Sequence, residues 1–231
     1  MWSAKDFLKK VKVNAFSFAF TFLISVAISS LYPAVRDFVS WHAQYQLCQA
    51  AAQGKTTTVN LLLLMGANPD GFNTTYSPLL FAARYGQRDS ARILLDAGAS
   101  IDNVGSWRQT PVMEAVQARD VETAQLLLSR GASVTKTDLH SGTALWHAAR
   151  IRHVPLVRLL MQHGGRECVD AESALSAAVE GSHIEIVRAL LDGGVDPRDV
   201  TATHLVLPLV TVANQNRQPD IVKMLKDAGA K

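Results

Sequence analysis

The chain has 231 residues, of which 48% are hydrophobic and 19% are charged, a composition typical of folded globular proteins rather than disordered ones. Its net charge of +3 comes from residues 1–12, where four lysines outweigh one aspartate, so residues 13–231 sum to zero. Nucleic-acid binding needs a basic surface to neutralise phosphates, and a neutral body argues against that class of partner.

Residues 13–32 form an uncharged run in which fourteen of twenty side chains are apolar. A helix of about 20 apolar residues spans the hydrocarbon core of a membrane. We therefore predict a basic flank at 1–12 and a transmembrane signal anchor at 13–32. The alternatives are a cleaved signal peptide, with Ser25-Val26-Ala27 as its cleavage site, and a buried helix of a soluble protein. The run is longer than a signal-peptide core, which favours the anchor.

The flanking charges predict the orientation of this segment. Four lysines precede it, whereas only Arg36 follows within ten residues, so the positive-inside rule places the N-terminus in the cytoplasm and the body in the periplasm or its equivalent. Cleavage would instead release a soluble periplasmic protein. In this segment a hydroxyl side chain recurs at every fourth residue, at Ser17, Thr21, Ser25 and Ser29. Small side chains at this spacing let two membrane helices approach closely, which predicts homo-oligomers. The alternative is that the hydroxyls form hydrogen bonds to carbonyls of their own helix. Residues 33–44 follow as a tether of at most about 40 Å when extended.

The remaining residues, 45–231, repeat with a period near 33. Each unit opens with a triplet whose second residue is proline or alanine and whose third is leucine or valine. The triplets begin at Ser77, Thr110, Thr143, Ser173 and Leu207. Serine or threonine there can cap a helix, and the alanines that follow allow close helix approach. Paired large apolar residues then predict the buried stripe of a second helix. Closing glycines suit left-handed caps, and they are Gly98, Gly131, Gly164, Gly194 and Gly229.

These residues resemble the ankyrin repeat, a 33-residue unit with a T-P-L-H-x-A signature, two antiparallel helices and a β-turn finger. The resemblance covers about four-fifths of the chain and implies an all-α ankyrin-repeat solenoid of five to six helix-turn-helix units with short β-turn fingers, preceded by one transmembrane helix. The step from Thr143 to Ser173 is three residues short, so we expect a truncated finger at Arg166–Asp170. The signature histidine is replaced by Leu80, Met113, Trp146 and Ser176, and we expect Trp146 to fill the core.

Motifs for chemistry are weak throughout the sequence. Gly54-Lys55-Thr56-Thr57 resembles the end of a phosphate-binding loop but lacks its first glycine, so we interpret it as a turn between helices. The seven histidines and two cysteines show no metal-ligand spacing, and we expect Cys48 and Cys168 to be free thiols in distant units. Asp170 and Glu172 are expected to be solvated. We predict no enzyme activity, metal, cofactor or small-molecule substrate.

The family resemblance implies that a partner protein binds the concave face built by fingers and first helices. By position, the candidate contact residues are Asn73, Tyr76, Arg84, Tyr85, Trp107, Gln109, Glu114, Gln117, His140, His147 and Arg150. Trp107 is the strongest candidate for a partner contact, because tryptophan is enriched at binding hot spots. The alternative is that Trp107 packs on the neighbouring finger.

We therefore predict a membrane-tethered protein–protein interaction module. Resemblance to bacterial relatives implies two specific versions: an immunity-type inhibitor of a toxic secreted enzyme such as a phospholipase, or a periplasmic accessory protein for an oxidative-stress enzyme such as catalase. An enzymatic role is the alternative from a different class. The residues do not separate the first two versions.

Overall fold

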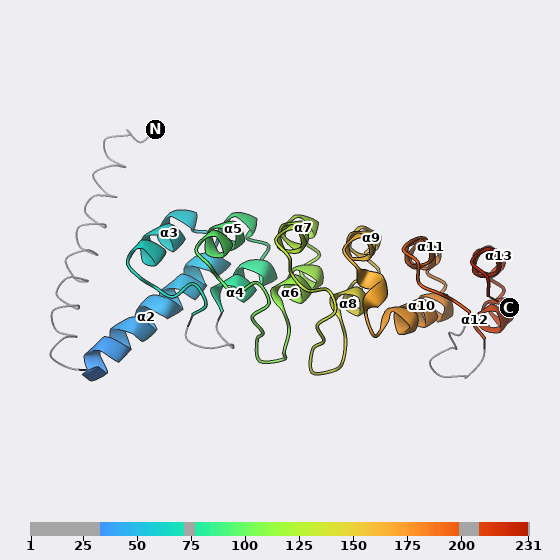
Figure 1. Ribbon diagram of the computed structural model, residues 1–231, viewed down its shortest axis with the longest axis horizontal. Helices are drawn as coiled ribbons and strands as arrows, with labels where there is room; N and C mark the ends of the chain where they lie inside the picture. Colours follow the sequence, from blue (N-terminus) through green and yellow to red (C-terminus); the bar gives the residue numbers. More distant parts are fainter. Residues whose placement is uncertain (1–32, 72–76, 199–207, 231) are drawn as a thin grey trace, which may run out of the picture. The chain divides into compact units, whose positions relative to one another are not determined.

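The computed structural model describes residues 33–71, 77–198 and 208–230 (Figure 1). Within these ranges the backbone forms twelve α-helices, one short 3-10 helix and no β-strand. The helices are α2 (Pro33–Ala52), α3 (Thr56–Leu64), α4 (Pro78–Arg84), α5 (Arg88–Asp96), α6 (Pro111–Gln117), α7 (Val121–Ser129), α8 (Ala144–Arg150), α9 (Val154–Gln162), the 3-10 helix η2 (Gly165–Glu167), α10 (Ala171–Glu180), α11 (Ile184–Asp192), α12 (Leu209–Gln215) and α13 (Pro219–Asp227).

The chain divides into two compact units, Met1–Gln46 and Leu47–Lys231. The predicted membrane segment, with its stripe of Ser17, Thr21, Ser25 and Ser29, lies outside the described residues. Among the helices that are described, none combines the length and the apolar character needed to cross a membrane. The predicted tether is a helix rather than extended chain, because α2 begins at Pro33 and proline is tolerated in a first helical turn.

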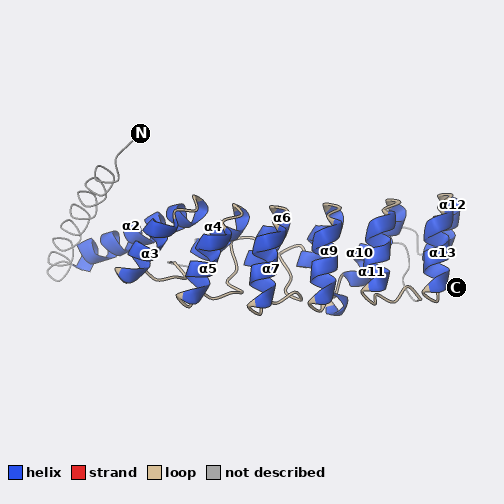
Figure 2. Cartoon of the chain, turned by 90° about the horizontal axis from the view of Figure 1, so that it is seen from above, coloured by secondary structure: helices blue, strands red, loops and turns tan. Residues whose placement is uncertain are grey.

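The second unit is a row of antiparallel helix pairs. The first helices α4, α6, α8, α10 and α12 contact one another in sequence and form one layer, while α3, α5, α7, α9, α11 and α13 form the other. Seen from above, the pairs follow one another side by side (Figure 2). At the start of the row, Leu47, Ala50 and Ala51 at the end of α2 belong to the same buried core as Val59 and Leu62 of α3. The predicted all-α solenoid of paired helices is confirmed.

A single apolar core runs through the whole second unit. Each second helix contributes at least one leucine that is at most 2% exposed, and these include Leu62, Leu94, Leu127, Leu160, Leu190 and Leu225. The first helices contribute buried alanines such as Ala82, Ala115 and Ala148, whose small side chains let neighbouring pairs approach. Burying one leucine side chain contributes roughly 1.5–3 kcal/mol, so the shared core is the main stabilising element of the row.

Two of the predicted capping residues act as caps, whereas Ser77 precedes α4 without a side-chain cap hydrogen bond and Ser173 lies elsewhere in its helix. Thr110 and Thr143 each accept a backbone hydrogen bond at the start of α6 and α8. The five closing glycines have positive φ between 88° and 97°, as left-handed caps require. Ser173 lies inside α10 because that helix begins two residues earlier, at Ala171, after Asp170.

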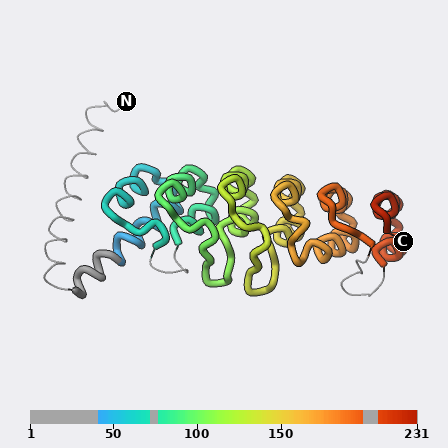
Figure 3. The backbone as a smooth tube through the Cα atoms, in the orientation of Figure 1, coloured from blue at the N-terminus to red at the C-terminus, as the bar shows by residue number. Residues whose placement is uncertain are grey.

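Two loops project beyond the layer of first helices (Figure 3). We call residues 100–109 the Trp107 finger and residues 133–142 the His140 finger. Each ends in a tight turn, in which Gly105 N donates to Gln109 O at 3.0 Å and Asp138 N donates to Gly142 O at 3.0 Å. Leu139 N also donates to Trp107 O at 3.0 Å. This bond joins the two fingers, and the predicted β-turn fingers are confirmed here.

The finger expected between α9 and α10 is truncated, as the shortened repeat predicts. The one-turn helix η2 replaces it and leads directly into α10. Our expectation that Asp170 is solvated is wrong, because its side chain is buried and accepts hydrogen bonds from Thr143 N and Thr143 Oγ1, both at 2.7 Å. The short connection brings this carboxylate onto the cap of the preceding helix pair. Glu172 is exposed, as expected.

Candidate functional site

The fingers present large apolar side chains to solvent. Trp107 is 59% exposed and Leu139 is 53% exposed, while Tyr85, at the end of α4, is 56% exposed. The indole of Trp107 stacks on the ring of His140, with centroids 6.3 Å apart and planes 20° from parallel. Trp107 therefore both packs on the neighbouring finger and keeps more than half of its surface free.

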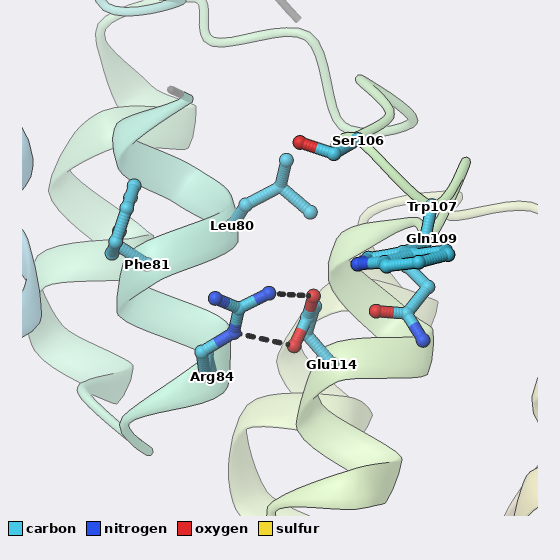
Figure 4. A pocket seen from close by; sticks show the side chains of 8 residues that line it. Leu80, Phe81, Arg84, Ser106, Trp107, Gln109 and Glu114 are labelled. Atoms are coloured by element: carbon cyan, nitrogen blue, oxygen red, sulfur yellow. Dashed lines mark hydrogen bonds and ion pairs between the residues drawn. The ribbon is translucent and has the colours of Figure 1, made fainter. Parts of the chain in front are cut away.

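A cavity of about 200 Å³ lies between the Trp107 finger, α4 and α6. Its walls are Leu80, Phe81 and Trp107, with Ser106 and Gln109 at the finger side (Figure 4). A more open hollow of about 550 Å³ continues past Gln117 to His140. Together these spaces form a groove, large enough for side chains of another protein, on the same side as the fingers.

The Arg84–Glu114 ion pair forms the base of this groove (Figure 4). The guanidinium donates two hydrogen bonds, from Nε to Oε2 at 2.9 Å and from Nη2 to Oε1 at 2.6 Å. Only 4% of the Glu114 side chain is exposed, against 48% for Arg84. The hydrogen bond with Glu114 raises the pKa of Arg84. Because Glu114 is fully engaged, it positions Arg84 rather than offering a free carboxylate.

The His140 finger is anchored by a buried carboxylate. Asp138 accepts hydrogen bonds from His140 N at 2.8 Å and Gly142 N at 3.0 Å, and its Oδ2 lies 2.9 Å from His147 Nε2. Burial alone would raise the pKa of Asp138, but these hydrogen bonds and the interaction with His147 hold it below its usual value. The cluster fixes the backbone that carries Leu139 and His140.

Our expectation for Trp146 is wrong, because its side chain is half-buried and does not fill the core. The guanidinium carbon of Arg150 lies 5.1 Å from the centre of the indole ring, a cation–π geometry. A Cβ built on Gly142 would lie 3.0 Å from the indole atom Cε3. The indole therefore packs against the base of the His140 finger, and the histidine buried in this pair is His147.

The structure brings most of the predicted contact residues together. Six of them line the same hollow, and these are Arg84, Trp107, Gln109, Glu114, Gln117 and His140. Tyr85, directly after α4, and Arg150, the last residue of α8, are exposed. His147 is only 4% exposed and faces Asp138, so it holds the finger and has no surface for a partner. Asn73 and Tyr76 lie outside the described residues.

Sequence reasoning missed three residues of this surface. Leu80 and Phe81 belong to a first helix and line the cavity, although no sequence pattern marked them as contact residues. Leu139 is an exposed leucine at a turn, and an apolar residue between Asp138 and His140 in a polar loop was the available signal.

The described residues hold no group of three or more histidine, cysteine, aspartate or glutamate side chains arranged to bind a metal ion. Cys48 and Cys168 are buried and form no disulfide bond in the described structure, and burial raises their pKa values to about 12 and about 11. Neither is a reactive thiolate at neutral pH. Gly54, with φ of 66°, lies in the turn between α2 and α3, in agreement with our interpretation of that motif.

Comparison with known proteins gives consistent matches. Residues 47–138 and 135–201 match the family model of ankyrin repeats (3 copies). An ankyrin repeat and KH domain-containing protein of Caenorhabditis briggsae is 37% identical over 70 residues, which are 30% of this chain and 3% of that protein. The chain thus corresponds to a small part of that relative.

Solved structures match over most of the chain. An ankyrin repeat domain from Acinetobacter baumannii AYE is 25% identical, with a TM-score of 0.70 over 81% of this chain and 99% of that one. The human ASB11 ankyrin repeat domain, at 22% identity, has a TM-score of 0.61 over 80% of this chain and 84% of its own, and this likeness concerns the fold alone.

Proposed function

The chain belongs to the ankyrin-repeat family, whose repeats are in general protein–protein interaction modules, and from that premise we propose that it binds a partner protein through its finger face. We define the finger face as the exposed side chains of the Trp107 finger, the His140 finger, α4 with Tyr85 at its end, α6 and α8. The observation that carries the proposal is the exposure of Trp107 and Leu139, at 59% and 53%, beside a groove.

The finger face is pre-organised for binding. The bond from Leu139 N to Trp107 O and the Asp138 cluster hold both fingers in one arrangement. Little conformational entropy would then be lost when a partner binds, which favours affinity. Tryptophan, tyrosine and arginine are also the residue types that dominate binding energy at interfaces, and the face carries all three.

Affinity capture from the native host tests this function. The full chain, solubilised in a neutral detergent, is compared with Trp107→Ala and Tyr85→Ala. Leu64→Ala is the matched control, because Leu64 is 86% exposed on α3, in the other layer of helices. We expect a protein that is retained by the wild type and by the control but reduced about tenfold or more by Trp107→Ala, as for a hot-spot residue. Capture that is undiminished by both face substitutions would refute the assignment.

Membrane tethering is a second part of the proposal, supported by the uncharged run at 13–32 and the lysines before it. A single-pass anchor would hold the repeats near the membrane on the periplasmic side. C-terminal fusions to alkaline phosphatase and to a fluorescent protein test the orientation, and a cytoplasmic signal alone would contradict it. Retention of the chain in membranes after a high-salt wash distinguishes the anchor from a cleaved signal.

The identity of the captured protein separates the specific roles. A toxic secreted enzyme such as a phospholipase, with its activity blocked by the chain, would assign an immunity-type inhibitor. Catalase or a similar enzyme, with its activity supported, would assign an accessory role. Turnover by the purified chain that a single groove substitution abolishes would instead assign an enzyme. Cross-linking in membranes tests homo-oligomers formed through residues 13–32.

A further inference from the structure

The negatively charged side chains of the finger face are all paired within the protein. From Ser77 to Arg150, the carboxylates in the fingers and first helices are Asp102, Glu114 and Asp138. Glu114 is held by Arg84, and Asp138 is buried against His147. Asp102 accepts from Ser133 N at 3.0 Å and lies 3.8 Å from Lys136 Nζ. All three carboxylates are therefore engaged within the protein itself.

Two cations on the same face have no such partner. Arg108 follows Trp107 at the finger tip, and Arg150 ends α8; both are exposed. In the described part of the chain, neither lies within ion-pair distance of a carboxylate. Arg150 lies over the indole of Trp146 instead, which orients its charge without neutralising it. The finger face therefore has an excess of positive charge, although residues 13–231 as a whole sum to zero.

The apolar part of the face limits what this charge can bind. Trp107 and Leu139 are exposed on the two joined fingers, Arg108 directly follows Trp107, and the cavity next to Trp107 is walled by Leu80 and Phe81. A surface that binds by charge alone, such as one for phosphates, would need a larger basic cluster. Apolar anchors with two cations at their edge instead match a polypeptide with complementary charge.

We propose that the finger face selects an acidic, apolar segment of its partner protein. One bulky apolar side chain of that segment enters the cavity beside Trp107, and neighbouring aspartate or glutamate side chains pair with Arg108 and Arg150. This inference rests on the proposed function, since it names the chemistry of the partner at the same face.

Selection from a random 16-residue peptide library displayed on phage tests the inference with a defined probe. The detergent-solubilised full chain is the target, and three variants are compared with it: Trp107→Ala, Arg108→Glu/Arg150→Glu, and the control Lys223→Glu/Lys226→Glu. The control changes the net charge equally but lies on the exposed side of α13. Circular dichroism verifies that each variant retains its helices.

We expect enriched peptides that carry net negative charge and at least one large apolar residue. Their affinity should fall about tenfold or more for the double arginine variant, remain unchanged for the lysine control, and weaken as salt screens the charges. Peptides that are neutral or basic yet lost in Trp107→Ala would overturn the charge inference and leave the proposed function standing. Failure to enrich any Trp107-dependent peptide would overturn both. Binding to phosphatidylserine vesicles that depends on the two arginines, without acidic peptides, would assign the face to a membrane instead.

Discussion

At the residue scale, Asp138 accepts hydrogen bonds from two backbone amides of its own finger and from a buried imidazole. Asp138→Ala would leave these donors without a partner inside the fold, at a cost of about 1–3 kcal/mol for an unsatisfied buried group. We expect urea denaturation to show a loss of about 3 kcal/mol. Asp89→Ala, which removes an exposed pair with Arg92, should change stability by less than about 1 kcal/mol. Equal midpoints for the two variants would contradict this account of the finger.

The same carboxylate predicts a pH dependence. Because the pKa of Asp138 is lowered on folding, its contribution is complete above the unfolded pKa of about 3.9 and is lost as the pH falls through the lower folded value. The stability difference between wild type and Asp138→Ala should be constant from about pH 7 to pH 5 and shrink below about pH 4. If the stability difference between the two proteins instead grew as the pH fell, the lowered pKa of Asp138 in the folded protein would be contradicted.

At the element scale, the helix pairs depend on residues in the left-handed region. Gly98 closes α5 with φ of 88°, and a built Cβ there has nothing within 4 Å. Gly98→Ala should therefore lose about 1 kcal/mol through backbone strain alone. Arg217, with φ of 56° in the turn before α13, offers the opposite change, and Arg217→Gly should be neutral or stabilising. Thermal unfolding measures the stability of both variants. A Gly98→Ala variant that is more stable than the wild type would contradict the role of Gly98 as a left-handed cap.

The sequence periodicity was sufficient to predict the helix pairs, because capping threonines, small alanines, buried leucines and closing glycines act locally. It was not sufficient for Ser173, since the shortened connection at η2 moves the start of α10 to Ala171. Asp170 and His147 were misassigned for a related reason. Their burial depends on hydrogen bonds to residues in another segment, Thr143 and Asp138, and no local pattern contains that information.

The positions of the site residues could be predicted from the sequence, but whether each side chain is free or already paired could not. Trp107 and Tyr85 were identified from the family pattern, and both are exposed. Glu114 was identified in the same way, yet its side chain is committed to Arg84. Distinguishing a free group from a paired one requires the distance between side chains 30 residues apart, which only the folded arrangement gives.

At the scale of the whole second unit, each helix pair makes its main contacts with its neighbours, so stability should be distributed along the row. Leu127 and Leu225 are both 0% exposed, and alanine at either position should cost about 2–5 kcal/mol locally. We expect hydrogen exchange to accelerate only in α12 and α13 for Leu225→Ala. Leu127→Ala, in a central pair, should affect helices on both sides. Uniform acceleration by both variants would indicate one cooperative block.

The central claim is that the finger face is the surface that a partner protein contacts. Site-specific photo-crosslinking in the native host measures this directly, with benzoylphenylalanine placed at Trp107 or at Leu64. The account predicts a crosslinked partner at position 107, identified by mass spectrometry, and none at position 64. A partner captured equally from position 64, or from that position alone, would contradict it.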